Sequence, residues 1–260
     1  MHFHSVYIVA AVASAAWAAP TNSFYNNAYD FTPELEEFYS RVSDYINNGN
    51  FRQQNSQTCD PSSVSLPALA SGLPAPTGAL KYVAIGRGTQ NYTCSDSTKD
   101  TTPAAIGALA SLYDASCIAA NYPDLLETAT NVVLNYDLST VDTDAPLPPA
   151  NAELLGHHYF EGTSNAVFNL DTTSEDQFGI AISKKNASMD APAGSVPGQN
   201  NSGDGAVPWL YLNTITGTVG NYTHVYRVNT AGGAAPSTCE GQSSAFQVQY
   251  SAQYFFYVSN

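Results

Sequence analysis

The sequence predicts an all-β fold, either an antiparallel β-sandwich or a barrel, with a peripheral N-terminal helix. Short apolar runs rich in Val, Ile, Tyr and Phe alternate with turn residues after Gly78, a pattern typical of strands. In the last run, 246–258, apolar and polar residues alternate as far as Gln253. Both faces are apolar from Phe255, which predicts a strand whose end is buried on both sides. Neither an internal repeat nor a second composition class is present, so we expect one β-rich domain over 66–260.

A secretory signal peptide is expected over residues 1–19. Residues 6–18 form an apolar, Ala-rich stretch that ends in the small-residue pattern Ala16-Trp17-Ala18. This stretch is too short to span a bilayer. The C-terminal run lacks the hydrophobic tail that a lipid-anchor signal needs. We therefore predict a secreted protein, extracellular or associated with the cell wall, with no membrane anchor.

An N-terminal helix followed by an irregular segment is expected over 20–65. Thr32 suits the N-cap position and Pro33 the first turn, and apolar residues then recur at helical spacing until an Asn-Asn-Gly sequence. This predicts a helix over 33–47. Residues 66–78 carry three prolines and two glycines, so we expect an extended segment there.

The later elements follow from the same patterns. Residues 124–134 are predicted to be helical behind Pro123, whereas residues 103–119 satisfy neither the helical nor the strand period cleanly. Residues 183–206, rich in Gly, Asn, Ser and Pro, predict a long loop. The runs expected to form strands before the last one are 80–86, 89–94, 156–161, 166–171, 178–183, 208–215 and 222–230.

The charge balance excludes some partners. Eight Lys and Arg face 22 Asp and Glu, which gives a net charge of −14. Binding to nucleic acid or to an anionic membrane needs clustered positive charge, and only Lys184 and Lys185 are adjacent. We therefore expect no nucleic-acid partner, and an acidic surface that keeps the protein soluble. Arg227, inside a predicted strand, is expected to pair with an Asp or Glu of the sheet.

Four cysteines predict two disulfides, because an even number in an exported chain argues for pairing. They are Cys59, Cys94, Cys117 and Cys239, and the sequence by itself leaves their pairing open. No Cys-x-x-Cys pair occurs, so zinc-ribbon and thioredoxin-like interpretations have no support.

Four N-glycosylation sequons make the chain a candidate glycoprotein. A sequence this rich in Asn, Ser and Thr produces about four by chance, so the sequons identify acceptors without proving their use. They begin at Asn91, Asn186, Asn200 and Asn221.

The candidate catalytic or metal-binding residues are His157, His158 and Glu161, with Asp171 on the next predicted strand. On a strand, His157 and Glu161 share one face. Such a pair could bind a divalent metal or act as acid and base if Asp171 or His224 joined it. The competing interpretation is structural, with one histidine facing solvent and the other hydrogen-bonded in the core. Serine-hydrolase and zinc-protease signatures are absent from the sequence.

Several of these runs strongly resemble, in order and sequence, a family of secreted fungal and bacterial proteins known as domain of unknown function 3455. The resemblance covers roughly residues 66–258 and implies a secreted, β-rich single domain without implying any activity. The runs that carry it are GTQNYTC (88–94), LYD (112–114), GHHYF (156–160), VPWL (207–210), HVYRVNTAGGAAPSTC (224–239) and VQYSAQYFFY (248–257).

Some fungal members of that family carry the label malate dehydrogenase, which the residues do not support. An NAD-dependent dehydrogenase needs a glycine-rich turn between a strand and a helix. The sequence offers only residues 86–91, in which Asn91 stands where the third glycine belongs, and a strand-like run follows. We therefore expect no nicotinamide cofactor.

The same resemblance implies a disulfide pairing. Shorter relatives keep mainly the cysteines that match Cys94 and Cys239, which makes sense if these two bond to each other. Cys59 and Cys117 would then form the second bond. The competing arrangement joins Cys94 to Cys117, with Cys59 bonded to Cys239.

The sequence favours a secreted, non-enzymatic protein, a binding module for a cell-wall polysaccharide or a small ligand. Aromatic side chains such as Trp209 could stack on sugar rings, or they could belong to the core. The alternative is a secreted metal-dependent enzyme built on the His157, His158 and Glu161 cluster. The first interpretation needs no cofactor, and the second needs a divalent metal.

Overall fold

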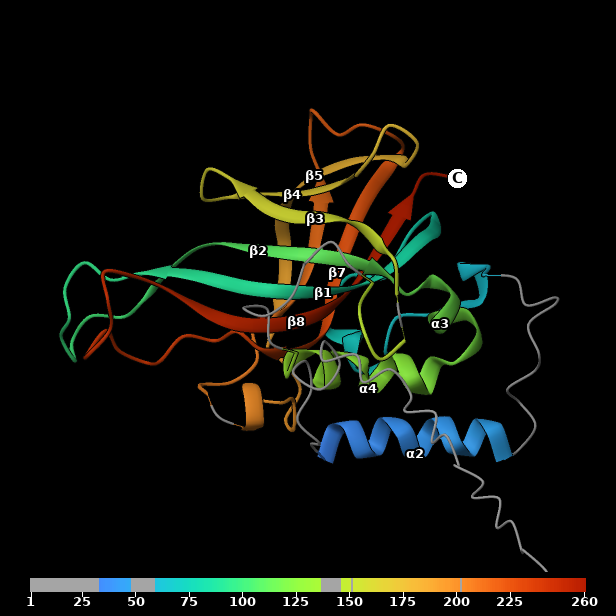
Figure 1. Cartoon of the computed structure of the whole chain (residues 1–260). Coiled ribbons are helices and arrows are strands. Elements are labelled where there is room, and N and C mark those ends of the chain that lie inside the picture. Colours follow the sequence, from blue (N-terminus) through green and yellow to red (C-terminus); the bar gives the residue numbers. More distant parts are fainter. Residues whose placement is uncertain (1–32, 48–58, 137–145, 151, 202) are drawn as a thin grey trace, which may run out of the picture.

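The computed structural model describes residues 33–47, 59–136, 146–150, 152–201 and 203–260 (Figure 1). Eight antiparallel strands follow one another around a closed barrel, and the last strand pairs with the first. The all-β prediction is confirmed, with a barrel as its form, whereas the signal peptide predicted over 1–19 lies outside the described residues. The strands are β1 (Ala79–Thr93), β2 (Ala104–Asp114), β3 (Leu154–Glu161), β4 (Asn165–Asp171), β5 (Gln177–Met189), β6 (Trp209–Thr214), β7 (Tyr222–Gly232) and β8 (Ala245–Val258).

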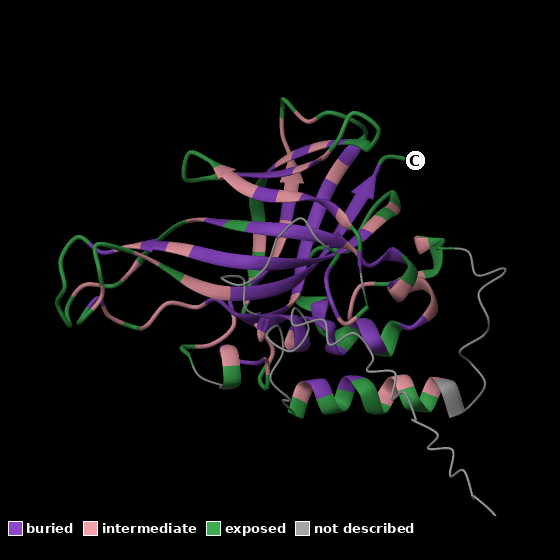
Figure 2. Cartoon of the chain, in the orientation of Figure 1, coloured by how far each residue is buried: buried purple, intermediate pink, exposed green. Residues whose placement is uncertain are grey.

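Helices cover one side of the barrel in two layers, as Figure 1 shows. Helix α4 lies against the barrel, and α2 lies on the far side of α4. Helix α2 buries Leu35 and Phe38 against Tyr122, Leu125 and Val132, while its outward face stays exposed (Figure 2). No helix in the described part of the chain is long and apolar enough to cross a bilayer. The helical elements are α2 (Pro33–Asn47), α3 (Ser116–Asn121), α4 (Pro123–Leu134) and the 3-10 turns η1 (Pro61–Ser63), η2 (Ala68–Gly72) and η3 (Gln199–Asn201).

Alternation along the strands creates two apolar cores. Side chains that point into the barrel, such as Phe168 and Phe256, form the inner core. Side chains of β1, β7 and β8 that point outwards, such as Val228 and Phe255, pack under α4 and form the outer core. Leu126 is among the α4 residues of this outer core. Strand β8 is therefore buried on both faces, and this burial begins at Tyr250, earlier than the sequence predicts.

Arg87 joins the barrel to the end of α4. It lies on the outer face of β1, is 1% exposed, and donates to five backbone carbonyls of the described residues. Three of the acceptors, on Val133, Leu134 and Tyr136, lie at 2.8–3.0 Å, at or just beyond the C-terminus of α4. The last carbonyls of a helix have no partner within the helix, and this end carries partial negative charge. The guanidinium therefore satisfies the carbonyls and stabilises the dipole.

Two polar residues of β8 hold the middle of α4. The Ser251 hydroxyl donates to the Thr130 carbonyl, and the Gln253 amide donates to the Leu126 carbonyl. Both side chains are at most 1% exposed. These two polar positions of the last strand thus face a helix backbone instead of solvent.

Strand β1 is continuous, although the sequence predicts two shorter runs, 80–86 and 89–94. The glycines on either side of Arg87 break the apolar pattern without ending the strand. A Cβ atom on Gly86 would lie 2.5 Å from the Tyr254 ring, and one on Gly88 would lie 2.0 Å from the Leu109 carbonyl oxygen. Both positions are glycine because barrel neighbours occupy the space that a side chain would need.

Three further predictions are corrected. Residues 103–119 contain strand β2 and then helix α3, so both periods are present. Residues 183–206 are not loop throughout, because β5 continues to Met189 by pairing with β6 across a bulge. Residues 66–78 include the 3-10 turn η2 within the expected extended segment. The helices predicted over 33–47 and 124–134 are present as α2 and α4.

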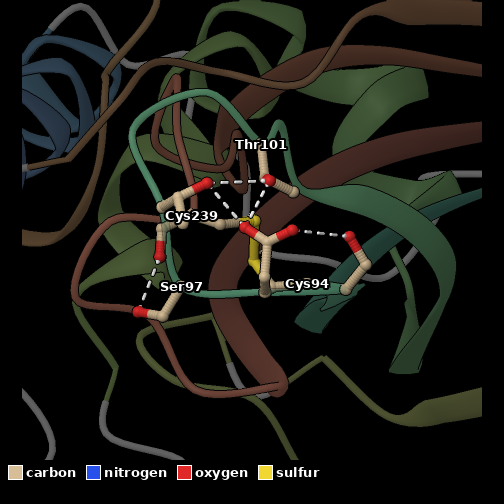
Figure 3. The surroundings of a disulfide bond; sticks show 7 residues. Cys94, Ser97, Thr101 and Cys239 are labelled. Atoms are coloured by element: carbon tan, nitrogen blue, oxygen red, sulfur yellow. Dashed lines mark hydrogen bonds between the residues drawn. A yellow bond between two sulfur atoms is a disulfide. The ribbon is translucent and has the colours of Figure 1, made fainter.

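Two disulfides tie the loops to the barrel. Cys94 bonds to Cys239 and Cys59 to Cys117, which is the pairing that the family resemblance implied. Figure 3 shows the first bond between the loop after β1 and the loop before β8. Around it, the Ser97 hydroxyl donates to the Cys239 carbonyl at 3.2 Å, and the Cys239 N–H donates to the Thr101 carbonyl at 2.7 Å.

Replacing Arg87 with methionine should lower the free energy of unfolding by about 3 kcal/mol or more, because buried carbonyls at the end of α4 lose their donor. Arg41→Met is the matched control. Arg41 lies in an exposed pair with Glu37 on α2, and its loss should cost about 1 kcal/mol or less. Urea unfolding of both variants measures the difference. Equal losses would show that Arg87 does not hold the helix.

Peptide mapping under non-reducing conditions should recover a peptide that links Cys94 to Cys239. This bond closes a loop of 145 residues, and removing it should cost about 4–5 kcal/mol according to loop-closure theory. Denaturant unfolding of Cys94→Ser/Cys239→Ser tests the magnitude. A peptide that links Cys94 to Cys117 would contradict the pairing.

Candidate functional site

His158 is a core residue of the barrel. It points inwards from β3, is 2% exposed, and stacks on the Phe168 ring with centroids 4.3 Å apart. Its Nδ1–H donates to the Val167 carbonyl at 2.9 Å, since a carbonyl can only accept. Burial lowers the pKa of His158 to about 4, and the positive charge of Arg227 adds to this effect. The imidazole is therefore neutral at neutral pH.

The other predicted site residues do not converge. His157 points outwards on β3 and is half-buried, and Glu161, on the same face, lies four residues further along. At the rise of a strand this separation is about 13 Å. Asp171 is the last residue of β4, at the end remote from Glu161, and accepts from the Gly179 N–H.

His224 cannot complete the cluster either. Strands β3 and β7 are four places apart in an eight-stranded ring, so they occupy opposite sides of the barrel. The ring of His224 stacks on Tyr257 with centroids 4.9 Å apart. Within the described ranges, no three His, Cys, Asp or Glu side chains are grouped so that they could hold a metal ion. The position of His158 fits the structural interpretation, in which one of the two adjacent histidines is hydrogen-bonded in the core.

A pocket of about 510 Å³ opens at one end of the barrel interior, and we call it the barrel-mouth pocket. Its wall comes from β1 to β7, the β3–β4 turn and the two residues before β6. The large apolar side chains that line it are Tyr92, Phe160, Val207, Pro208, Leu210 and Leu212, and the large polar ones are Gln90, Lys184, Lys185 and Arg227. The other half of the barrel interior is filled by rings, including those of Phe168, Tyr222, Tyr254 and Phe256.

The barrel-mouth pocket is positively charged in an acidic protein. Three of the eight Lys and Arg residues of the chain line it, while none of its described lining residues is Asp or Glu. Lys184 and Lys185 are exposed at its rim, and Arg227 is buried in its wall. Both ion pairs found among the described residues belong to Arg41, so neither lysine has a carboxylate partner there.

Arg227 pairs with no carboxylate among the described residues, so the expectation that it pairs with an Asp or Glu of the sheet is wrong. Its Nη2 donates to the Pro208 carbonyl at 2.9 Å, and its buried Nε has no hydrogen-bond partner in the described structure. Burial raises the pKa of Tyr92 and of Tyr254, and in both cases the charge of Arg227 opposes that rise. A side-chain hydrogen bond with Arg227 also lowers the pKa of Tyr254. The residues around this guanidinium are therefore neutral groups.

A second lining side chain also has an unused donor. The Nε2 atom of Gln90 is buried without a partner among the described residues, and Gln90, like Arg227, is 7% exposed. Another hollow of about 480 Å³ lies outside the barrel beside α4, but none of the partnerless atoms belongs to its described lining. Buried polar groups normally have partners. The barrel-mouth pocket is therefore the better candidate for a ligand site.

Trp209 lies outside any binding surface. It is 1% exposed in the outer core, so its ring cannot stack on a sugar. The glycine-rich residues 86–91 lie inside β1, with no helix behind them, and do not form a nucleotide-binding turn. Arg227 escaped the sequence analysis because it was expected to be paired. The sequence did contain a signal for it. Arg227 lies two residues after Val225 on a predicted strand, so both point to the same apolar face, where a charged residue is unusual.

The four sequon asparagines differ in accessibility. Asn186, Asn200 and Asn221 are exposed, whereas Asn91 is half-buried in β1. Their use as glycosylation sites stays a prediction.

The fold defines the class of this protein as a closed, eight-stranded antiparallel barrel, whose interior is wide enough for one small ligand. Residues 74–258 match the family described as "Protein of unknown function (DUF3455)", and the chain belongs to this family. Residues 10–74 match a second family, described as "Protein of unknown function (DUF2990)", so the Cys59–Cys117 disulfide joins the two matched regions. No curated protein and no solved structure matches the chain.

The pKa of His158 makes stability depend on pH. The unfolded histidine titrates near 6.5 and the folded one near 4, so the unfolded state binds more protons between these values. Stability should therefore fall as pH drops from 6.5 to 4, by at most about 3 kcal/mol from this residue. Urea unfolding across this range should show a shallower pH dependence in His158→Phe. An unchanged dependence in the variant would contradict the assignment.

Proposed function

We propose that this protein is a secreted, non-enzymatic binding protein that holds a small molecule in the barrel-mouth pocket. The observation that carries the proposal is the pair of partnerless buried donors, on Gln90 and Arg227, beside a pocket of about 510 Å³. Binding sites for small molecules have this size, and they combine an apolar lining with a few polar groups that fix orientation.

Secretion is supported by the apolar N-terminal residues and by the two disulfides. Disulfides persist in oxidising compartments, of which the extracellular space is one. The net charge of −14 suits a soluble extracellular protein. Of the two partner classes predicted from the sequence, the small ligand is favoured, because Trp209 is unavailable to a polysaccharide chain.

Binding without turnover is supported by the chemistry of the lining. General acid–base catalysis relies on imidazole or carboxylate groups in most enzymes. Among the described residues that line the barrel-mouth pocket there is no His, Asp, Glu or Cys. A bound molecule therefore meets donors and apolar surface, without an acid–base pair.

The proposal predicts that the neutral fluorescent probe N-phenyl-1-naphthylamine binds in a 1:1 ratio and that Ala105→Trp weakens its binding at least about tenfold. Ala105 is exposed on β2 at the pocket, so an indole there fills the opening at little cost to the fold. Fluorescence titration gives the affinity, and thermal melting checks folding.

The matched control is Ala104→Trp. Ala104 is equally exposed, but it points to the other side of β2 and is not among the described lining residues. This variant should bind the probe as the unmodified protein does. Absence of saturable binding in the unmodified protein, or equal loss in both variants, would overturn the proposed function.

A further inference from the structure

We propose that the molecule held in the barrel-mouth pocket is an amphiphilic organic anion, with a carboxylate head bound by Arg227 and Gln90 and an apolar body against the lining of the pocket. This inference rests on the proposed function and names the chemistry of its ligand.

The head group follows from the state of Arg227. A guanidinium cannot release its proton at any ordinary pH, so it stays charged even when buried. A buried charge without a counter-charge is costly, and proteins normally supply a partner. Arg227 donates to the Pro208 carbonyl and has a side-chain hydrogen bond with Tyr254, but its Nε–H has no acceptor and no carboxylate lies beside it among the described residues. An anionic ligand supplies the missing charge and the missing acceptor together.

The second donor narrows the choice of anion. A carboxylate has two oxygens that accept from a planar fork, which suits the Arg227 guanidinium. Gln90 adds one neutral N–H donor that has no acceptor among the described residues. Arg227 is the one buried cation among the described lining residues, so the site matches a single negative charge better than the two charges of a phosphate.

The apolar body follows from the rest of the lining. Tyr92, Phe160, Leu210 and Leu212 offer rings and branched chains, and burying apolar surface against them favours binding. The exposed Lys184 and Lys185 lie at the opening. In a chain of net charge −14 they form a local positive region that draws an anion to this end of the barrel.

Three probes with one body and different heads test the inference: 4-phenylbutanoate, 4-phenylbutan-1-ol and 4-phenylbutylamine. Titration calorimetry at pH 7, with both disulfides intact, should show the carboxylate binding at least about tenfold more tightly than the alcohol. The amine should bind most weakly. In ¹⁵N-labelled protein the Arg227 Nε–H signal should shift when the carboxylate binds, because that atom gains an acceptor.

Variants separate the head group from the body. Arg227→Met should reduce carboxylate affinity to that of the alcohol while leaving alcohol affinity within about twofold. The same change should raise the melting temperature, because a buried charge is removed. Gln90→Met should weaken carboxylate binding about fivefold through loss of one hydrogen bond. Lys99→Met removes an exposed cation outside the pocket and should change nothing.

The outcomes are distinguishable. Equal affinity for carboxylate and alcohol, or an equal loss in Lys99→Met, would overturn the anion inference and leave the binding function standing. If none of the three probes binds but N-phenyl-1-naphthylamine does, the anion inference again fails alone. Failure of all four probes would overturn the proposed function as well. Should Arg227→Met not fold, the Nε–H signal of the unmodified protein still decides the question.

Discussion

The attachment of α4 to the barrel depends on one buried guanidinium. Arg87 places its charge where the last carbonyls of α4 meet the outer face of β1. These carbonyls accept hydrogen bonds from the guanidinium and replace the water that burial removes from both groups. Ser251 and Gln253 repeat the same chemistry along the helix. Because the helix is held by its backbone, its apolar side chains can close the outer core. Helix α2 can then pack on the opposite face of α4.

The two buried arginines of the barrel contrast in their surroundings. Among the described residues, Arg87 on the outer face of β1 donates to five carbonyls, three of them at the end of α4, whereas Arg227 on the inner side donates to one carbonyl. Arg87 has a structural role, because each of these hydrogen bonds also satisfies a backbone carbonyl. Arg227 has an N–H donor in the wall of a pocket that no described residue uses. Retaining such a group lowers stability, and this cost fits the proposal that Arg227 serves binding. This difference is why the proposed site lies inside the barrel mouth and not at the histidines.

Much of the fold was predictable from local patterns. The proline and the apolar spacing of 33–47 were enough to predict α2, and the strand runs appear where alternation placed them. Two of the failures share one cause. Gly86 and Gly88 look like a break in a strand, yet they are required by the approach of Tyr254 and β2. The stretch that begins at Lys184 looks like loop, yet β6 supplies a partner for its backbone. Contacts from distant strands override local propensity there.

By itself, the sequence determined the class of fold, the positions of most elements and the acidic surface, because periodicity, capping and charge are local properties. It also carried the family resemblance, from which the disulfide pairing followed. The tertiary structure decided that His158 is buried, that His157, Glu161 and His224 are kept apart, and that Arg227 has no carboxylate partner in the described part of the chain. These facts depend on the side of the barrel to which each side chain points and on the strand that lies opposite. Both are set by ring closure, which joins residues far apart in the chain.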